Sequence, residues 1–245
     1  MTTMADSLQS FYDRTYVEGT EILRTSKQYT IDCVPSDAVF DILDVGCGSG
    51  ENSLALAAKG HRLHGIDLSP VAIERYRNHG FEGRVGDLGS GIDYPDASFD
   101  LVFCSEVIEH MTAPERLATE IYRVLRPNGR LVLSTPNSAF WLYRLLGLFG
   151  YTVGELQHPK HFQFFSRRSL LRLLKTAGFS PIRLQGRNIY VFLPDPPELL
   201  RPLLQTLNFR REERFRTKGH FWHWSTKSNF WNALFADTLI AVMKK

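Results

Sequence analysis

The chain has 245 residues, of which 43% are hydrophobic and 22% are charged, and its formal net charge is +3. These values fit a globular protein and exclude a disordered or fibrous chain. No run reaches the ~20 apolar residues that a membrane span needs, and residues 1–10 lack the apolar core of a secretion signal. We therefore expect one cytoplasmic domain with a sizeable core.

The cysteine content and the charge exclude further classes. Cys33, Cys47 and Cys104 lie far apart and form no CxxC pair, which argues against a zinc site or a disulfide framework. A net charge of +3 is too small to indicate a nucleic-acid-binding protein by itself.

The first predicted strand, residues 42–45, runs into a glycine-rich turn. Gly46, Gly48 and Gly50 follow it as GxGxG, and Asp44 stands two residues before the first glycine. Glycine at alternate positions permits positive φ angles and lets a ligand approach the backbone closely. A dinucleotide site would instead read GxGxxG. The turn therefore indicates a nucleoside-bearing cofactor; the alternative is a tight strand-to-helix turn without a ligand.

A helix predicted over residues 51–59 is followed by a second strand that ends at Asp67. A carboxylate at that position can accept hydrogen bonds from both hydroxyls of a ribose. The alternative role for this acid is to cap the helix predicted over residues 71–78. Ser69 already fills that role, with Pro70 at the first helical position.

A third predicted strand ends near Asp87 and Leu88. The acid can accept a hydrogen bond from the amino group of an adenine, and the leucine can pack on the ring. Acids thus recur at successive strand ends, and ligands of open α/β sheets bind beyond those ends. One cofactor lying across the sheet edge would explain this recurrence.

These motifs resemble those of class I S-adenosylmethionine-dependent methyltransferases, over about residues 38–186 and the C-terminal strand. The resemblance implies S-adenosylmethionine as the cofactor, with Asp44 facing its ammonium group. It implies a methyl transfer but no particular acceptor. The cofactor-binding residues that it implies are Asp44, Gly46, Gly48, Gly50, Asp67, Leu68, Asp87, Leu88, Ser105 and Glu106.

The fourth predicted strand, residues 99–104, leads into an ExxEH sequence formed by Glu106, Glu109 and His110. Residues i and i+3 of a helical turn share a face, so both carboxylates and the imidazole could converge on one cation. Carboxylates suit Mg²⁺ or Mn²⁺, and an added imidazole is tolerated better by Mn²⁺, Fe²⁺ or Co²⁺. In the alternative, Glu106 closes over the cofactor, Glu109 is solvated and His110 packs or forms a hydrogen bond.

The ExxEH triplet is similar to the metal ligands of two methyltransferase families. One comprises the ubiquinone-biosynthesis O-methyltransferases, and the other the small-RNA terminal ribose 2′-O-methyltransferases, which add a histidine from a later HxF-type motif. His161, in the sequence HPKHFQF, stands in the corresponding place. The resemblance implies a divalent-cation site of Glu106, Glu109, His110 and His161. A hydroxyl acceptor must also lose a proton, and His110 and His161 are the candidate catalytic bases.

The rest of the chain continues the alternation of strands and helices. Apolar residues at helical spacing predict helices over residues 114–125 and 166–176, and a fifth strand over 131–137. Residues 235–243 read as the last strand, which the resemblance places antiparallel between the fifth and the sixth. We expect a Rossmann-like, doubly wound α/β sheet of seven mostly parallel strands in a single domain, residues 1–245.

Three segments exceed the minimal fold and are candidates for a substrate lid: residues 1–37, 138–165 and 187–234. Residues 139–151, in the second, are rich in leucine and aromatic side chains, which suits an interfacial helix, the wall of an apolar acceptor pocket, or a lid helix buried on the core. The third holds a basic and aromatic stretch that suits anionic headgroups, stacked bases or a solvated surface. Between Arg201 and Lys227 this stretch contains Phe209, Arg210, Arg211, Arg214, Phe215, Arg216, Lys218, Phe221, Trp222 and Trp224.

Together these features predict a cytoplasmic S-adenosylmethionine-dependent methyltransferase that resembles the ubiquinone-biosynthesis O-methyltransferases. Its expected acceptor is a small or lipid-linked hydroxyl compound, such as a quinone precursor, a glycan or a secondary metabolite, and a peripheral membrane contact would suit the lipid-linked case. Two alternatives stay open. One is RNA ribose 2′-O-methylation, which the basic stretch and His161 favour, and the other is a non-catalytic cofactor-binding regulatory subunit.

Overall fold

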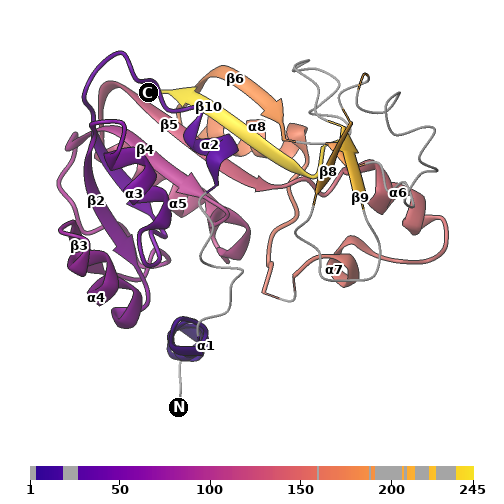
Figure 1. The fold of residues 1–245 in the computed structure, drawn as a ribbon, viewed down its shortest axis with the longest axis horizontal. Helices are drawn as coiled ribbons and strands as arrows, with labels where there is room; N and C mark the ends of the chain where they lie inside the picture. The colour runs from indigo at the N-terminus through magenta and orange to yellow at the C-terminus, as the bar shows by residue number, and fades with distance from the viewer. Residues whose placement is uncertain are drawn as a thin grey trace.

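Figure 1 shows the fold as a computed structural model, in which a central sheet carries helices on both faces. The order of the strands in that sheet is β3-β2-β1-β4-β5-β10-β6, and a smaller sheet has the order β7-β9-β8. The structure describes residues 4–18, 27–158, 160–187, 189–190, 206, 209–212, 221–224 and 236–245.

The central sheet confirms the predicted fold class. Neighbouring strands are parallel, except that β10 is antiparallel to both β5 and β6. The last strand therefore lies antiparallel between the fifth and the sixth, as predicted. The seven strands are β1 (Asp41–Val45), β2 (Arg62–Asp67), β3 (Glu82–Val85), β4 (Phe99–Ser105), β5 (Leu125–Pro136), β6 (Ser180–Gly186) and β10 (Thr238–Lys244).

The helices lie between the strands or precede the sheet. The start of one of them, at residue 70, is as predicted: Ser69 Oγ accepts a hydrogen bond from Ala72 N at 3.2 Å, and Pro70 is the first helical residue. No helix in the described part of the chain is long and apolar enough to cross a membrane. The helices are α1 (Met4–Glu18), α2 (Gln28–Ile31), α3 (Glu51–Ala57), α4 (Pro70–Asn78), the 3₁₀ turn η2 (Ile108–His110), α5 (Pro114–Val124), α6 (Trp141–Gly147), α7 (Val153–Leu156) and α8 (Arg167–Thr176).

The side chains of β1 contribute to two separate cores, because successive residues of a strand point to opposite faces of the sheet. Leu43 and Val45 belong to the core that α5 and α8 cover, whereas Ile42 belongs to the core beneath α2 and α3. All three side chains are fully buried. Burial on both faces is typical of central parallel strands. It holds β1 in place, and β1 in turn positions the glycine turn that follows it.

β5 begins earlier than the sequence predicts. Leu125 pairs with Phe99 while Arg130 pairs with Leu101, so the residues between Leu125 and Arg130 form an irregularity in the pairing with β4. Asn128, within this irregularity, has a φ of +67°. The Arg-Pro-Asn-Gly sequence does turn the chain, but the pairing of Leu125 extends the strand on the amino-terminal side of that turn.

Most of the predicted lid segment 187–234 lies outside the described residues. In its smaller sheet, only the backbone pairing of β9 with β7 and β8 is described. The rest of the basic and aromatic stretch lies outside the residues that the structure describes, and so does Phe235 of the predicted last strand. The three strands of the smaller sheet are β7 (Ile189–Tyr190), β8 (Phe209–Glu212) and β9 (Phe221–Trp224).

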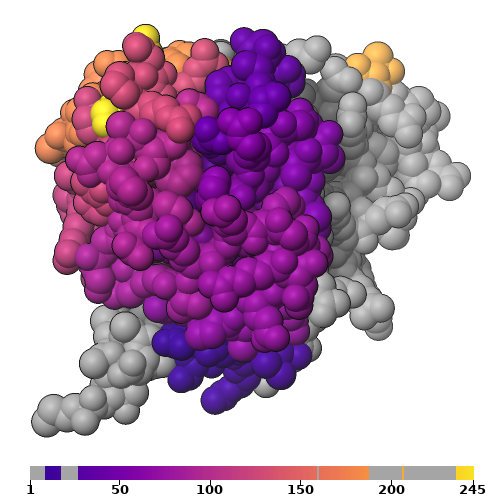
Figure 2. All heavy atoms as spheres, turned by 90° about the vertical axis from the view of Figure 1, so that its left-hand side faces the viewer, coloured from indigo at the N-terminus to yellow at the C-terminus, as the bar shows by residue number. Residues whose placement is uncertain are grey.

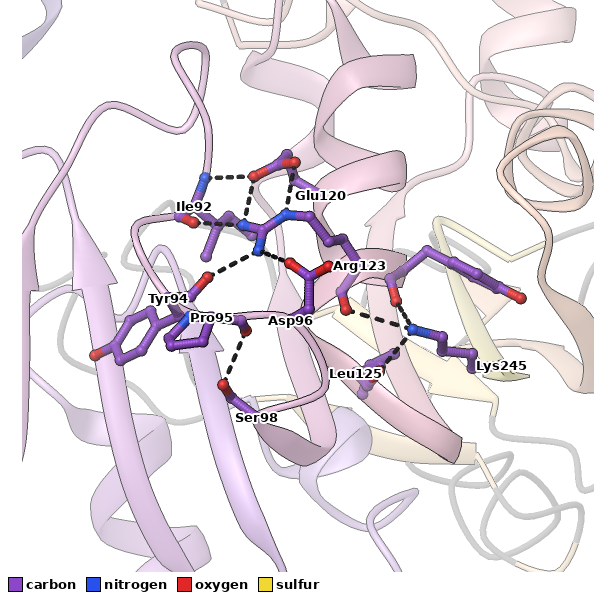
Figure 3. A network of polar contacts seen from close by, with 10 residues as sticks. Ile92, Tyr94, Pro95, Asp96, Ser98, Glu120, Arg123, Leu125 and Lys245 are labelled. Atoms are coloured by element: carbon purple, nitrogen blue, oxygen red, sulfur yellow. Dashed lines mark hydrogen bonds and ion pairs between the residues drawn. The ribbon is translucent and has the colours of Figure 1, made fainter.

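A polar network fastens the C-terminal end of α5 (Figure 3). Lys245 Nζ donates to the carbonyl oxygens of Tyr122 at 2.6 Å and of Leu125 at 2.7 Å. Arg123, on the same helix, forms an ion pair with Glu120 at 2.8 Å. Carbonyls in the last turn of a helix lack partners within the helix and carry partial negative charge, so an ammonium group stabilises them. These contacts tie the end of β10 to α5, at the edge of the sheet opposite the carboxyl ends of the parallel strands.

Candidate active site

The glycine turn after β1 has the conformation that its sequence predicts. Gly46, Gly48 and Gly50 have φ angles of +69°, +54° and +100°. A Cβ atom on Gly46 would lie 2.5 Å from Val107 Cγ2, and one on Gly48 would lie 2.7 Å from Tyr16 Oη. The turn therefore requires glycine for its backbone conformation and also because neighbouring side chains approach it closely.

Asp67, the predicted ribose ligand, lies at the end of β2 and is buried beside the glycine turn. Its Oδ2 accepts a hydrogen bond from Gly48 N at 2.9 Å, and its Oδ1 accepts one from Ser69 N at 2.9 Å. Burial raises the pKa of this carboxyl above its usual range. The acid thus joins the first turn to the start of α4, and each oxygen keeps a further lone pair for a ligand.

Asp44 lies beneath the same turn, with its carboxyl buried in the protein. Ser53 Oγ donates to Asp44 Oδ2 at 2.7 Å, and Tyr76 Oη lies 2.9 Å from Ser53 Oγ. Burial is the main cause that raises the pKa of Asp44 to about 7, and the nearby acids Asp67 and Glu51 add to it. A cation that reached this carboxyl would lower its pKa again.

The third pair of predicted cofactor ligands follows β3, which ends two residues earlier than Asp87. Asp87 Oδ1 accepts from Gly89 N at 2.9 Å, and its Oδ2 accepts from Ser90 Oγ at 2.8 Å, so the acid closes a tight turn. Leu88 is buried in the core that α5 covers, and Leu68, after β2, is half-buried. The roles of these residues toward adenine stay predictions.

Glu106 lies in a left-handed turn directly after β4, with a φ of +59°. Its Oε1 accepts from Ser134 Oγ at 2.8 Å, and Ser105 Oγ lies 2.9 Å from Ser134 Oγ. The helical turn that would place Glu106 and Glu109 on one face does not form, because the 3₁₀ turn begins only at Ile108. Glu106 therefore points toward β5 rather than toward the histidines.

Glu109 is buried within η2, although the alternative drawn from the sequence has it solvated. Its Oε2 accepts from Thr135 Oγ1 at 3.0 Å, whereas its Oε1 has no hydrogen-bond partner among the described residues. Burial, and secondarily Glu106, raises the pKa of this carboxyl well above its usual range. The backbone carbonyl of Glu109 accepts from Phe162 N at 2.9 Å, which holds the segment that carries His161 against η2.

The rings of His110 and His161 lie 4.8 Å apart. His110 Nδ1 is 3.0 Å from the carbonyl oxygen of Lys160, and His161 Nδ1 is 3.1 Å from Gln157 Oε1. Because an amide oxygen can only accept, both Nδ1 atoms carry the proton and both Nε2 atoms keep a lone pair. Burial lowers the pKa of His110 and lowers that of His161 to about 4, so both rings are neutral at pH 7.

Glu109, His110 and His161 form the histidine–glutamate cluster, in which one ligand atom from each residue lies within 4.8 Å of the others. Their hydrogen bonds match the usual arrangement of metal-binding histidines, whose second nitrogen donates to an oxygen. The unpartnered Oε1 of Glu109 is a further ligand atom for a cation. The cluster thus fits a divalent cation chemically, and Glu106 is not one of the residues that the structure brings together there.

α1 covers the boundary between the glycine turn and this cluster. Figure 2 shows its indigo atoms seated against the purple surface to which α4 contributes, and the two helices are in contact. Ser69 Oγ donates to Asp13 Oδ1, and the ring of Tyr12 meets His110 edge to face at 6.4 Å. Burial is the main cause that raises the pKa of Tyr12 to about 12.

Residues 1–37 are a candidate lid from the sequence, but no local pattern indicates which of their side chains reach the site. Tyr12 and Tyr16 are the two that do, at the cluster and at the glycine turn. Thr135, which donates to Glu109, is not among the residues predicted for the site, although its place at the end of β5 in the run Ser134-Thr135-Pro136 is typical of a sheet-edge residue.

The sheet order, the antiparallel last strand and the glycine turn flanked by strand-end acids define the class I S-adenosylmethionine-dependent methyltransferase fold. The chain belongs to the methyltransferase domain family, whose model matches residues 10–184.

Curated relatives give a more detailed comparison. The ubiquinone biosynthesis O-methyltransferase of Aromatoleum aromaticum is 33% identical over 160 residues, which cover 59% of this chain and 66% of the relative. The protein of the same name from Idiomarina loihiensis is 32% identical over 157 residues, which cover 59% of this chain and 63% of the relative. Each match spans less than two thirds of the relative's own length.

Solved structures support the fold over most of the chain. A S-adenosylmethionine-dependent methyltransferase of Thermotoga maritima aligns with a TM-score of 0.61 at 18% identity and covers 96% of this chain and 99% of its own. The 1,6-didemethyltoxoflavin-N1-methyltransferase of Burkholderia thailandensis, solved with that compound and S-adenosylhomocysteine, aligns with a TM-score of 0.60 at 17% identity and covers 98% of this chain and 88% of its own. Such low identities show the fold alone.

Proposed function

We propose that this protein transfers the methyl group of S-adenosylmethionine to a hydroxyl group of a small or lipid-linked acceptor. The observation that carries the proposal is the position of the histidine–glutamate cluster, with two neutral imidazoles, at the same sheet edge as the glycine turn. The curated relatives that are named ubiquinone biosynthesis O-methyltransferases support an oxygen acceptor.

The buried acids suit the cofactor in the orientation that the sequence predicts. Asp44, with its raised pKa, would gain from the ammonium group of S-adenosylmethionine, because an opposite charge favours the ionised carboxylate. Asp67 has lone pairs left for the ribose hydroxyls beyond the two backbone bonds that hold it. Asp87 and Leu88 would then border the adenine. α1 would close over the bound cofactor as the N-terminal part of a lid.

The chemistry needs alignment and the removal of one proton. The acceptor oxygen attacks the methyl carbon in line with the sulfur, the O–CH₃ bond forms as the S–CH₃ bond breaks, and the sulfonium becomes a neutral thioether. The hydroxyl proton passes to Nε2 of His110 or His161, whose Nδ1 atoms are already held by oxygen acceptors. A general base of this kind contributes a factor of about 10² to 10⁴ in rate, and the alignment contributes several kcal/mol.

In place of this general-base role, the cluster would hold a divalent cation through Glu109 and the Nε2 atoms of His110 and His161, because one lone pair cannot both bind a cation and accept a proton. One carboxylate with two imidazoles suits Mn²⁺, Fe²⁺, Co²⁺ or Zn²⁺ better than Mg²⁺, which prefers oxygen ligands. When bound, such an ion supplies Lewis acidity that lowers the pKa of the acceptor hydroxyl. The neutral state of both histidines favours this role, because a protonated imidazole cannot ligate a metal.

Exposed apolar side chains on and after α6 support a lipid-linked acceptor and a peripheral membrane contact. No side chain of α6 is buried, which argues against a lid helix packed on the core. Leu148 is 81% exposed and Phe149 is 75% exposed. Side chains of this kind beside a basic residue, here Arg144, can enter the boundary between lipid headgroups and acyl chains.

A second candidate function is ribose 2′-O-methylation of RNA, and the place of His161 in the cluster favours it. The RNA methyltransferases that the sequence resembles add such a histidine to an ExxEH triplet. This function would require binding that weakens steeply with salt, because phosphate contacts release counterions.

The test is to incubate the protein with methyl-labelled S-adenosylmethionine and a host-cell extract, with and without EDTA. Label in the organic-soluble or small polar fraction would support the proposal, and label in RNA would replace it with the second candidate. Loss of label with EDTA, restored by Mn²⁺, would support the cation site. Cofactor binding in calorimetry without transfer to any fraction would indicate a non-catalytic cofactor-binding subunit.

A further inference from the structure

The helix α8 has a face on which cations gather without acids. Its sequence, RRSLLRLLKT, contains four basic residues and no acidic residue. The leucines Leu170, Leu173 and Leu174 are buried in the core, so the basic side chains lie on the exposed side of the helix. These basic residues are Arg167, Arg168, Arg172 and Lys175.

Three of these cations line one hollow on the exposed side of α8. The hollow has a volume of about 520 Å³, and its lining includes no carboxylate among the described residues. Along the helix axis Arg172 lies about 6 Å from Arg168 and about 4.5 Å from Lys175, because each residue adds about 1.5 Å. The hollow therefore brings three positive charges together within two helical turns. Its lining residues are Arg168, Leu171, Arg172, Lys175 and Thr176.

This arrangement of charges destabilises the helix that carries it. Residues three or four apart are neighbours on a helix surface, so Arg172 repels both Arg168 and Lys175. Arg168 also stands in the first turn, where the partial positive charge of the helix end disfavours a cation and no acid offsets it. α5 follows the opposite, stabilising rule, with Glu115 in its first turn and Arg123 in its last.

Arginines elsewhere in the described part of the chain differ from those of α8, because they are paired with acids. None of the four basic side chains of α8 has an ion-pair or hydrogen-bond partner among the described residues. Departures from the rules of helix stability that no contact within the fold offsets are typical of functional surfaces. The unbalanced charge therefore indicates a ligand that supplies the negative charge. The paired arginines are Arg62, Arg84, Arg123 and Arg126.

We propose that the hollow on α8 is a binding site for a phosphate group. Two guanidinium groups and one ammonium group supply charge-assisted donors for phosphate oxygens, and the hydroxyl of Thr176 adds a further donor. A guanidinium binds two oxygens of one phosphate at once, which favours phosphate over a monatomic anion. Such a group occurs on free metabolites and on the headgroups of anionic lipids. The site is independent of the proposed function, because no residue of the hollow belongs to the site of methyl transfer.

The test measures two kinds of binding with the full chain. Calorimetry follows the binding of inorganic pyrophosphate, with potassium chloride at the same ionic strength as the control for charge screening. Co-sedimentation follows binding to phosphatidylcholine vesicles with and without phosphatidylglycerol. The variants are Arg168→Gln and Arg172→Gln. Arg167→Gln is the matched control, because Arg167 is an exposed arginine of the same helix that does not line the hollow.

We expect about a tenfold loss of affinity in Arg168→Gln and in Arg172→Gln, and nearly wild-type affinity in Arg167→Gln. Such a loss with pyrophosphate supports the site with a free phosphate compound as ligand, and a loss only with phosphatidylglycerol vesicles supports it with a lipid headgroup. If the wild type binds neither probe, or if all three variants bind as the wild type does or lose affinity equally, the site is overturned.

Thermal unfolding without ligand separates binding from a role in the fold. Arg172→Gln should unfold at the same temperature as the wild type or at a higher one, because the substitution relieves the repulsion by its neighbours. A marked fall in the unfolding temperature would show that Arg172 stabilises the fold, which overturns the proposal.

Discussion

The carboxyl group of Asp44 is buried and accepts a hydrogen bond from Ser53 Oγ, so the protonation of this acid affects the stability of the fold. Burial raises its pKa from 3.8 to about 7. Between these values the folded state binds the proton and the unfolded state does not, so the free energy of unfolding falls as the pH rises from about 4 to about 7. Asp44→Asn should remove this component.

Urea unfolding of the wild type and of Asp44→Asn at several pH values measures this effect. The difference in unfolding free energy between the two proteins should change by a few kcal/mol in favour of the variant across that range. Parallel curves would show that the carboxyl is not desolvated as the structure places it.

His110 is the residue whose removal best separates catalysis from cofactor binding. Its Nδ1 is held by the carbonyl of Lys160, and its neutral Nε2 is available as a base. His110→Ala should lower kcat by a factor of about 10² to 10⁴ and leave the affinity for S-adenosylmethionine almost unchanged. The exposed His79 provides the control, as His79→Ala. A variant with wild-type kcat would make His110 structural.

Single residues of the site were predictable from the sequence where one short segment determines their geometry. They were not predictable where the geometry depends on backbone angles or on contacts distant in sequence. The glycine turn and the cap of α4 are local, and both are as predicted. Glu106 and Glu109 are also close in sequence, but the positive φ of Glu106 separates them, and the spacing i, i+3 cannot reveal it. Tyr12 meets His110 only through the packing of α1 at the sheet edge, so no local pattern marks this contact.

At the scale of elements, the end of α5 depends on one ammonium group from the end of β10. Lys245→Met would leave the carbonyls of Tyr122 and Leu125 without this donor. We expect the free energy of unfolding to fall by about 1 to 2 kcal/mol, while kcat and KM stay unchanged because the network lies at the opposite edge of the sheet. Thermal or urea unfolding measures the effect.

The neighbouring residue offers a matched control for this prediction. Lys244 is the exposed last residue of β10, directly before Lys245, and Lys244→Met should change the stability by less than about 0.5 kcal/mol. If both variants lost the same unfolding free energy, the hydrogen bonds of Lys245 to the end of α5 would not be the cause of the loss.

The helices and strands themselves were largely predictable, because buried parallel strands read as apolar runs and helices as apolar residues at helical spacing. α5 and α8 begin and end within one residue of the predicted bounds. β5 differs because its first residue pairs across an irregularity, which depends on the register with β4. The division of residues 138–165 into α6 and α7 was not predictable, since little of this segment is fixed by the core.

At the scale of the whole molecule, the exposed apolar residues after α6 predict association with lipid. Leu148→Ser with Phe149→Ser should reduce co-sedimentation with phosphatidylglycerol-containing vesicles at least several-fold, because it removes apolar area that the bilayer would bury. Ile182, which is 53% exposed on β6, gives the control Ile182→Ser. Equal sedimentation of all three proteins would contradict a membrane contact at α6.

The place of β10 also imposes an order on biosynthesis. Among the described strands, β6 lies at the edge of the sheet and pairs only with β10, the last strand of all. The strands that carry the glycine turn and Asp67 are translated long before it, and they can assemble while the ribosome is still at work. β6 cannot take its place until β10 has left the exit tunnel. A nascent chain should therefore assemble the half of the sheet that carries the glycine turn before it completes the half formed by β10 and β6.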